Sequence, residues 1–376
     1  MDGRHHPPEH WVASQYVRHT QPAELFNVNQ PGAESMPIKR IPSTDFAEIS
    51  AAWDTMNDAH YGHPLLEARF TETALAHIGN RSESIFVLGD FNQPDAIFVM
   101  EPSRLGTWST FQASQSPLGA AIIRPDAALE SLGSALFREL PLTCQALSVT
   151  QQDPDILPRP THSAVLDTLD YIPTARITLE GTFDDYWAAR GKNLRHNIKR
   201  QRNRLEREGI PLRLEVLTRP EEMEMGVREY GELESRGWKA EHGTAVHPEN
   251  AQGRFYTSLL EQYAATGDAS IYRYFYGDDL VAIDLCISGP KAFIILKTTY
   301  DESIEGSSPA LLMRREYFPS LFVEHKAERI EFYGRVMDWH TKWSDEIRNL
   351  YHANIYRSPF VARVHARLQR ATQRRG

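Results

Sequence analysis

The pattern of apolar and polar positions is sharpest between Ala292 and Phe318. The nine-residue run Ala292–Tyr300 is rich in Ile, Phe, Thr and Tyr and predicts a β-strand. The polar segment Asp301–Ser307 ends this strand, and Ser308-Pro309 then supplies an N-cap serine and a proline at the first helical position. We expect a helix to begin there, with free N–H groups and a positive dipole end that favour an anion such as a pyrophosphate. A capped helix without any ligand is the alternative.

Two apolar runs precede this strand, Ser270–Tyr276 and Leu280–Ser288. Because only short turns separate the three runs, we expect them to form an antiparallel meander. Downstream, Pro319 predicts that the new helix breaks or kinks after Phe318.

The rest of the chain alternates between helical and strand periodicity. In the first half the expected helices are Phe46–Met56, Glu67–Ile78 and Glu130–Leu140, and the expected strands are Ser84–Leu88, Ala96–Glu101, Gly119–Ile123 and Leu147–Gln151. In the second half the expected helices are Phe183–Glu208, Pro220–Arg236, Arg254–Ala265, Trp339–Leu350 and Pro359–Gln373, and the expected further strands are Tyr171–Leu179, Leu212–Leu217, Arg329–Tyr333 and Tyr351–Arg357.

These elements predict the α/β (α+β) class, with two domains that each contain a mixed, mostly antiparallel sheet flanked by helices. The expected domains are residues 36–160 and 161–358, with Pro158–Pro160 as a linker. A flexible leader is expected over residues 1–35, and a basic helix over residues 359–376.

Composition supports a folded chain of this size. The 376 residues are 41% hydrophobic, which is enough to fill two cores. No apolar run approaches the ~20 residues that a membrane helix needs, and the N-terminus lacks the apolar core of a signal peptide, so we expect a cytoplasmic protein. Cys144 and Cys286 are expected to be buried thiols. We expect no metal, because the pair His60 and His63 has no third ligand at a suitable spacing.

Charge is unevenly distributed along the chain. The net charge is −9, yet the segment Arg190–Arg207 contains eight cations and one acid, and the segment from Arg363 to Arg375 contains five arginines and no acid. Such asymmetry indicates contact with phosphates or acidic partners, and a solvated helix face is the alternative.

The order of elements and several motifs resemble the GNAT acyltransferase superfamily. The motifs are residues 234–239 (ESRGWK), 243–245 (GTA), Leu296-Lys297, 300–302 (YDE) and 308–312 (SPALL), which resemble the branch described as cellulose-biosynthesis-type acetyltransferases. The resemblance covers roughly residues 183–343. It implies two GNAT-like domains, of which residues 36–160 are a degenerate one and residues 161–358 are the acyltransferase domain. Ala310 stands where the family pattern has glycine.

The resemblance implies acyl-CoA (acetyl-CoA or longer) as co-substrate and an amine, small or an envelope precursor, as acceptor that attacks directly in a ternary complex. The implied catalytic residues are Glu234, Tyr300 and Asp301. The implied cofactor-binding residues are Lys297, Gly306, Ser307, Ser308, Ala310 and Leu311. The implied substrate-binding residues are Arg195, Trp238, Lys239, Thr244 and Glu302.

Two other functions are compatible with the sequence. A Fem-type transferase has a doubled GNAT fold and takes its acyl group from aminoacyl-tRNA, whose phosphates suit the cations of residues 190–207. A non-catalytic binding module could use the same basic helix. The net negative charge and the lack of aromatic residues among those cations argue against nucleic acid as a general partner.

Overall fold

One mixed sheet runs through residues 36–104, 106–236 and 246–373, which are the residues that this computed structural model describes. Its strand order is β1-β2-β3-β4-β6-β13-β7-β12-β11-β10-β9-β8, with β5 paired to β3. The strands are β1 Ile38–Pro42, β2 Ser84–Gly89, β3 Pro94–Arg104, β4 Thr107–Thr110, β5 Ala121–Ile123, β6 Ala146–Gln152, β7 Leu166–Thr178, β8 Leu212–Leu217, β9 Ala269–Tyr276, β10 Asp279–Ser288, β11 Phe293–Tyr300, β12 Arg329–Glu331 and β13 Glu346–Tyr356. Within this described part, β4 with β6 and β11 with β12 are parallel pairs, and the other pairs are antiparallel.

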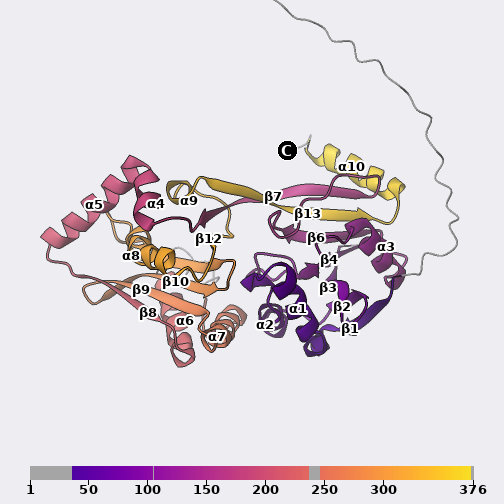
Figure 1. The fold of residues 1–376 in the computed structure, drawn as a ribbon, viewed down its shortest axis with the longest axis horizontal. Coiled ribbons are helices and arrows are strands. Elements are labelled where there is room, and N and C mark those ends of the chain that lie inside the picture. The colour runs from indigo at the N-terminus through magenta and orange to yellow at the C-terminus, as the bar shows by residue number, and fades with distance from the viewer. Residues whose placement is uncertain (1–35, 105, 237–245, 374–376) are drawn as a thin grey trace, which may run out of the picture. The chain divides into compact units, whose positions relative to one another are not determined.

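Helices cover both faces of the sheet (Figure 1). They are η1 Ser43–Glu48, α1 Ser50–His60, η2 Pro64–Leu66, α2 Ala68–His77, α3 Leu129–Glu139, α4 Phe183–Ala189, α5 Lys192–Arg207, α6 Pro220–Glu234, α7 Ala251–Ala264, α8 Pro309–Glu324, α9 His340–Trp343 and α10 Pro359–Gln373. Figure 1 shows α4, α5 and α8 on one side of strands β8–β10 and α6 and α7 on the other side. The expected mixed α/β class, with helices flanking a mostly antiparallel sheet, is therefore confirmed.

Three cores fill the space between these layers. The first core contains buried residues of α1, α2, α6 and α7 together with β2, β3 and β10, so both halves of the chain contribute to it. Its centre includes the rings of Phe70 on α2 and Phe255 on α7, which lie 5.9 Å apart. The second core lies under α4, α5 and α8, and the third lies under α3. Burial of apolar area shared between the halves stabilises them as one folded unit.

Strands β7 and β13 connect the two halves within the sheet. β13 pairs with β6 of the first half on one side and with β7 on the other. β7 in turn pairs with β12 through Thr178 and Arg329. The division at residue 160 stays a prediction, and residues 1–35 lie outside the described residues.

The basic segment forms two helices where the sequence predicted one. The prediction of a single helix over Phe183–Glu208 is wrong, because α4 ends at Ala189 and α5 begins at Lys192. Arg190 adopts extended φ and ψ of −70° and 153°, and Gly191 is the N-cap of α5. Glycine has a high conformational cost inside a helix, which favours a break at this position.

Of the two predicted effects of Pro319, a break or a kink after Phe318, the break is wrong. The helix continues to Glu324. The second core buries Phe318, which precedes the proline, and Leu321 and Phe322, which follow it. Packing of these side chains outweighs the loss of one backbone hydrogen bond at the proline.

The expected helix Trp339–Leu350 is also wrong. Only His340–Trp343 is helical, and the eleven residues Glu346–Tyr356 form β13. β7 pairs with this strand from Glu346 to Ile355 and β6 pairs with it from Tyr351 to Tyr356, and this tertiary pairing overrides a local helical pattern.

Cys144 and Cys286 are both buried and free, as expected. Among the described residues, no helix is long and apolar enough to cross a lipid bilayer.

Replacing Pro319 by Ala should raise the free energy of unfolding by about 1–2 kcal/mol. A proline inside a helix costs about 3 kcal/mol relative to alanine, and the larger freedom of the unfolded alanine chain offsets up to about 1 kcal/mol. Urea unfolding followed by circular dichroism measures the change. The matched control is Pro359→Ala at the first position of α10, where proline is tolerated and the change should stay within about 0.5 kcal/mol. A less stable Pro319→Ala protein would contradict the prediction.

Candidate functional site

β11 parts from its parallel neighbour shortly after it begins. The two strands pair only at Phe293 with Ile330 and at Ile294 with Glu331, although β11 continues to Tyr300. On its other side β11 pairs with β10 up to Tyr300, with a register shift that leaves Leu296 as a bulged residue. Among the described strands, none pairs with β11 on the β12 side beyond Ile294. The carboxyl-terminal part of β11 therefore has an edge that is open to a ligand.

A cavity of about 580 Å³ lies at this open edge. Its walls come from four places in the chain: the end of β11, the loop before α8 with the first residues of α8, the end of α6, and the segment after β12. The lining residues are Glu234, Thr298, Thr299, Tyr300, Glu302, Ser307, Ser308, Pro309, Ala310, Leu311, Arg314, Met337, Trp339 and Lys342. This volume is in the ordinary range for a pocket that binds a small molecule.

Backbone N–H groups at the start of α8 are available to an anion. The N–H groups of Gly306, Ser307 and Ala310 make no hydrogen bond with any described residue. The N–H of Ser308 instead donates to the Oε1 of Gln201 on α5, at 2.9 Å. The sixteen-residue helix α8 adds the positive end of its dipole at the same place. The start of α8 therefore has the geometry expected of an anion seat, with one of its N–H groups occupied by a side chain, and its binding of an anion stays a prediction.

Helix α5 lies against this loop and brings positive charge to it. Arg204 Nη2 is 3.5 Å from the carbonyl oxygen of Glu305. A Cβ added at Gly306, which has a φ of +77°, would lie 2.3 Å from Arg204 Nη1. The positive φ at position 306 favours glycine, and an added Cβ would also force the Arg204 guanidinium, at the end of its flexible side chain, to move. Six further cations on α5 are exposed, namely Lys192, Arg195, Lys199, Arg200, Arg202 and Arg207.

A buried ion pair forms the floor of the cavity. Asp284 of β10 is 0% exposed and Arg314 of α8 is 1% exposed. Arg314 donates from Nε to Asp284 Oδ2 at 3.0 Å and from Nη2 to Oδ1 at 3.1 Å. Thr298 on β11 donates to Asp284 Oδ1 at 2.5 Å and accepts from Arg314 Nη2 at 2.6 Å, and Tyr317 donates to Asp284 Oδ2 at 2.8 Å. Burial alone would lower the pKa of Arg314, but the charge of Asp284 raises it above its ordinary value.

Trp339 forms the wall above this pair. The guanidinium carbon of Arg314 lies 4.5 Å from the centre of the Trp339 ring, a cation–π contact in a site shielded from water. Burial, together with the charge of Arg314, lowers the pKa of the neighbouring His340 to about 4, so this imidazole is neutral at neutral pH.

Glu234 is the buried carboxylate that faces the cavity from α6. It is 4% exposed and accepts a hydrogen bond from the N–H of Val246 at 2.9 Å. The hydroxyl of Tyr230 lies 3.1 Å from Glu234 Oε1 and 3.2 Å from the carbonyl oxygen of Thr298. Glu234 is thus tied to the open edge of β11 through one tyrosine.

The other predicted residues fall into three groups. Tyr300, Glu302, Ser307, Ser308, Ala310 and Leu311 line the cavity, and Tyr300 is 46% exposed at its rim. Asp301, Lys297, Gly306 and Arg195 do not line it. Trp238, Lys239 and Thr244 lie outside the described residues.

The side chains outside the cavity have identifiable environments. Asp301 Oδ1 accepts from the N–H of Ser303 at 2.9 Å and from its hydroxyl at 2.6 Å, so it shapes the turn after β11. Lys297 Nζ is 5.9 Å from the ring centre of Tyr256 on α7, across the sheet from α8. Arg195 is exposed on α5 and donates to the carbonyl oxygen of Arg190 at 3.0 Å.

Sequence reasoning missed Thr298, Thr299, Arg314, Met337, Trp339 and Lys342. A signal for the buried pair does exist in the sequence. Asp284 is a lone acid in the apolar run Leu280–Ser288, and a charged residue in such a run must be paired when buried.

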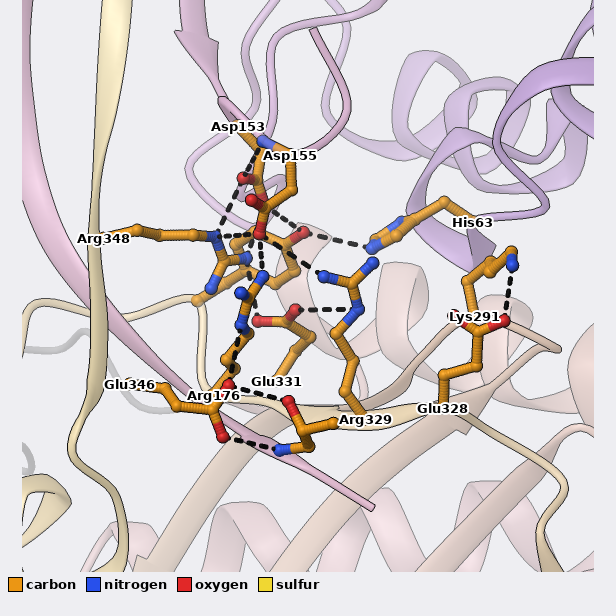
Figure 2. A network of polar contacts seen from close by, with 12 residues as sticks. His63, Asp153, Asp155, Arg176, Lys291, Glu328, Arg329, Glu331, Glu346 and Arg348 are labelled. Atoms are coloured by element: carbon orange, nitrogen blue, oxygen red, sulfur yellow. Dashed lines mark hydrogen bonds and ion pairs between the residues drawn. The ribbon is translucent and has the colours of Figure 1, made fainter. Parts of the chain in front are cut away.

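A second polar network joins the two halves of the chain beside β12 and β13 (Figure 2). Figure 2 shows Asp153 and Asp155, which follow β6, facing Arg348 of β13 and Arg329 of β12, while His63 approaches from the segment after α1. The hydroxyl of Tyr333 is 3.0 Å from His63 Nε2 and 2.8 Å from Asp153 Oδ2. Arg348 donates to both oxygens of Asp153 and, at 2.9 Å, to Glu331 Oε2. The network thus ties Glu331, the last residue of β12, to Arg348 of β13.

Burial sets the protonation of this network. It raises the pKa of Glu331 to about 7, because the two arginines nearby only partly offset the loss of hydration. It lowers the pKa of His63 to about 3, so this histidine is neutral. Burial opposes the charge of Asp153, but the hydrogen bonds and charge of Arg348 hold its pKa below the ordinary value. No group of three or more metal-ligating side chains occurs among the described residues.

Part of the chain matches a known protein family. Residues 192–341 match the family described as the acetyltransferase (GNAT) domain. The residues that line the cavity lie in the matched part, except Lys342. A search of curated proteins found no significant match.

Two solved structures share the fold at low sequence identity. One is the carboxyl-terminal domain (DUF2156) of a protein from Agrobacterium fabrum assigned as a lysylphosphatidylglycerol synthetase, with 12% identity, a TM-score of 0.51, and coverage of 86% of this chain and 96% of that one. The other is FemX, with 9% identity, a TM-score of 0.53, and coverage of 85% of this chain and 97% of that one. These findings support the GNAT superfamily and an acyltransferase fold, and they give no support to the cellulose-biosynthesis-type branch.

Replacing Arg314 by Met should lower the free energy of unfolding by about 3–5 kcal/mol, because it leaves the buried charge of Asp284 without its partner. The double variant Asp284→Asn with Arg314→Met should lose less than the sum of the two single changes. Urea unfolding of the four proteins measures this coupling. Lys39→Met, which breaks the exposed pair of Lys39 with Glu48, should change stability by less than about 1 kcal/mol. Additive effects of the two buried changes would contradict the prediction.

Replacing Glu331 by Gln should change how stability depends on pH. The pKa of Glu331 rises from 4.5 to about 7 on folding, so its contribution to stability is full below pH 4.5 and is lost as the pH rises to about 7. The native protein should therefore lose up to about 3 kcal/mol relative to Glu331→Gln across this window. Chemical unfolding at a series of pH values measures the difference, in which the contribution of His63 cancels because both proteins contain it. Parallel curves for the two proteins would refute the assignment.

Proposed function

We propose that this protein, whose residues 192–341 match a GNAT acetyltransferase domain, is an N-acyltransferase that takes its acyl group from acyl-CoA. The observation that carries this proposal is the open edge of β11 beside three free N–H groups at the start of α8. An acyl-CoA donor needs these two features together, since it has a pyrophosphate at one end and an extended amide-containing arm at the other.

The pyrophosphate is placed against the N–H groups of Gly306, Ser307 and Ala310. These donors, the dipole of α8 and the guanidinium of Arg204 all favour negative charge. The hydroxyl of Ser307, which accepts from Tyr276 at 3.1 Å, lies at the same loop. The pantetheine arm is placed along β11, where unpaired backbone groups can bind its amides as a neighbouring strand would.

Glu234 is our candidate for the general base. The amine nitrogen forms a bond to the thioester carbonyl carbon, the carbon–sulfur bond breaks, and the amine proton passes to Glu234 directly or through one water. Tyr300, at the rim, is placed to donate a proton to the leaving thiolate. Asp301 is the weaker base candidate because its Oδ1 accepts hydrogen bonds from the N–H and the hydroxyl of Ser303.

The acceptor is proposed to enter on the side of Glu302 and Glu234. Two carboxylates at the cavity suit an amine that is cationic before it reacts. Trp238, Lys239, Thr244, Arg195 and Lys297 keep their proposed roles in binding the acceptor or the donor. A small amine or an envelope precursor as acceptor, the cellulose-biosynthesis-type branch and a cytoplasmic location also stay predictions.

A Fem-type transfer from aminoacyl-tRNA is the second candidate. The six exposed cations of α5, the helix whose Arg204 contacts the loop before α8, favour it, because a tRNA donor would extend over such a surface. The likeness to FemX concerns the fold alone. A binding module without catalysis is the third candidate, and it would use residues 190–207 in the same way.

Calorimetric titration with acetyl-CoA, longer acyl-CoAs and aminoacyl-tRNA distinguishes these candidates. We expect acyl-CoA to bind, and we expect Gly306→Ala to weaken binding by about tenfold or more, since an added Cβ displaces Arg204 and strains the loop. Gly277→Ala is the matched control: its φ is also positive, at +61°, but no atom lies within 4 Å of the added Cβ. This control should have the same acyl-CoA affinity as the native protein.

Three outcomes of this titration distinguish the candidate functions. Absence of binding by every acyl-CoA at high micromolar concentration would refute the acyl-CoA proposal. Binding of aminoacyl-tRNA with a steep dependence on salt would then support the Fem-type candidate. Binding of acyl-CoA that persists unchanged in Gly306→Ala would place the donor elsewhere.

A further inference from the structure

Helix α10 presents apolar side chains to solvent. It packs against the end of β13, where the hydroxyl of Tyr356 lies 2.7 Å from His365 Nδ1 (Figure 1). Phe360 is 71% exposed, Val364 is 40% exposed and Leu368 is 63% exposed. A spacing of four residues puts these three side chains on one face of the helix.

Arginines flank this apolar stripe on the outer face. Arg363 and Arg367 are exposed, whereas Val361, Ala362, His365 and Ala366 are half-buried on the inner face. The sequence from Ser358 to Gly376 contains five arginines and no acidic residue, in a chain whose net charge is −9. The exposed face of α10 therefore combines an apolar stripe with two arginines, Arg363 and Arg367, which also line a hollow beside Asp167.

We propose that the outer face of α10 docks the protein on an anionic lipid bilayer, lying parallel to the membrane plane. Phe360, Val364 and Leu368 enter the boundary between headgroups and acyl chains, and Arg363 and Arg367 bind lipid phosphates. A helix with this division of residues has the properties of known interfacial helices. The proposal is independent of the acyl donor, because α10 contributes no residue to the cavity at β11.

Charge and apolarity together select this occupant over two others. A second copy of the chain, paired through the same face, would bring two sets of arginines together and would be opposed by their repulsion. A nucleic acid would bind the arginines but would leave the stripe of Phe360, Val364 and Leu368 in water. An anionic bilayer matches both halves of the surface.

Vesicle flotation with the full chain tests this proposal. Vesicles of phosphatidylcholine with about 30% phosphatidylglycerol should bind the protein at least about tenfold more tightly than pure phosphatidylcholine vesicles, with a loss of binding at high salt. Two variants should each weaken binding by about tenfold or more: Phe360→Ser with Val364→Ser, and Arg363→Gln with Arg367→Gln. Circular dichroism and thermal unfolding check that each variant is folded.

Matched controls alter the same residue types elsewhere. Leu142→Ser removes an apolar side chain that is 82% exposed in the loop after α3, and Lys199→Gln with Arg200→Gln removes two exposed cations of α5. Both controls should keep native binding. Equal binding to the two kinds of vesicle, or a loss caused by the α5 control but by neither α10 variant, would overturn the proposal. A dimer in sedimentation that dissociates in Phe360→Ser with Val364→Ser would assign this face to a second copy instead.

Discussion

The parting of β11 from β12 is the constraint on which the candidate site depends. Two parallel strands that pair briefly and then separate leave backbone edges without strand partners, and such edges must be satisfied in another way. On the β11 side, Thr298 is held by Asp284 and Arg314, and the Tyr230 hydroxyl reaches its carbonyl oxygen. On the β12 side, Glu331 is held by Arg348. Thr298 and Arg314, which line the cavity, are thus held in place by hydrogen bonds.

Both anchors use buried charge, and this choice has a physical consequence. A hydrophobic pair of similar volume would stabilise the fold as well or better, so buried ion pairs are retained where they fix an arrangement rather than where they add stability. Asp284 of β10 with Arg314 of α8 holds Thr298 of β11, and Arg348 of β13 with Glu331 holds the end of β12.

The exposed charges have a different distribution. The cations of α5 lie beside the loop before α8, whereas the arginines of α10 lie beside exposed apolar side chains. Positive charge next to free N–H groups suits a soluble phosphate, and positive charge next to an apolar stripe suits a lipid surface. Two basic helices that look alike in composition are thus placed for two different kinds of contact.

The sequence by itself determined the elements whose signals are local. The three runs before Tyr300 become the antiparallel strands β9, β10 and β11, because short turns leave no other pairing. Ser308 is the N-cap of α8, although its side chain makes no capping hydrogen bond, and Pro309 is the first helical residue. Gly306 marks the loop before the helix, since prolines and glycines act through their own backbone. Of the residues predicted to bind the cofactor at this loop, Ser307, Ser308, Ala310 and Leu311 line the cavity.

Only the tertiary structure decided the features that depend on distant partners. α8 continues through Pro319 because its later residues pack in the second core, and Glu346–Tyr356 becomes a strand because β6 and β7 pair with it on both sides. Asp284 and Arg314 are thirty residues apart, and Asp153 and Arg348 are 195 apart, so no local pattern shows which charges meet. Lys297 turns toward α7 rather than α8, because the bulge at Leu296 shifts the register of β11 with β10. The free-energy cost of a proline inside a helix and of buried charges is offset by packing and pairing that exist only once the whole chain has folded.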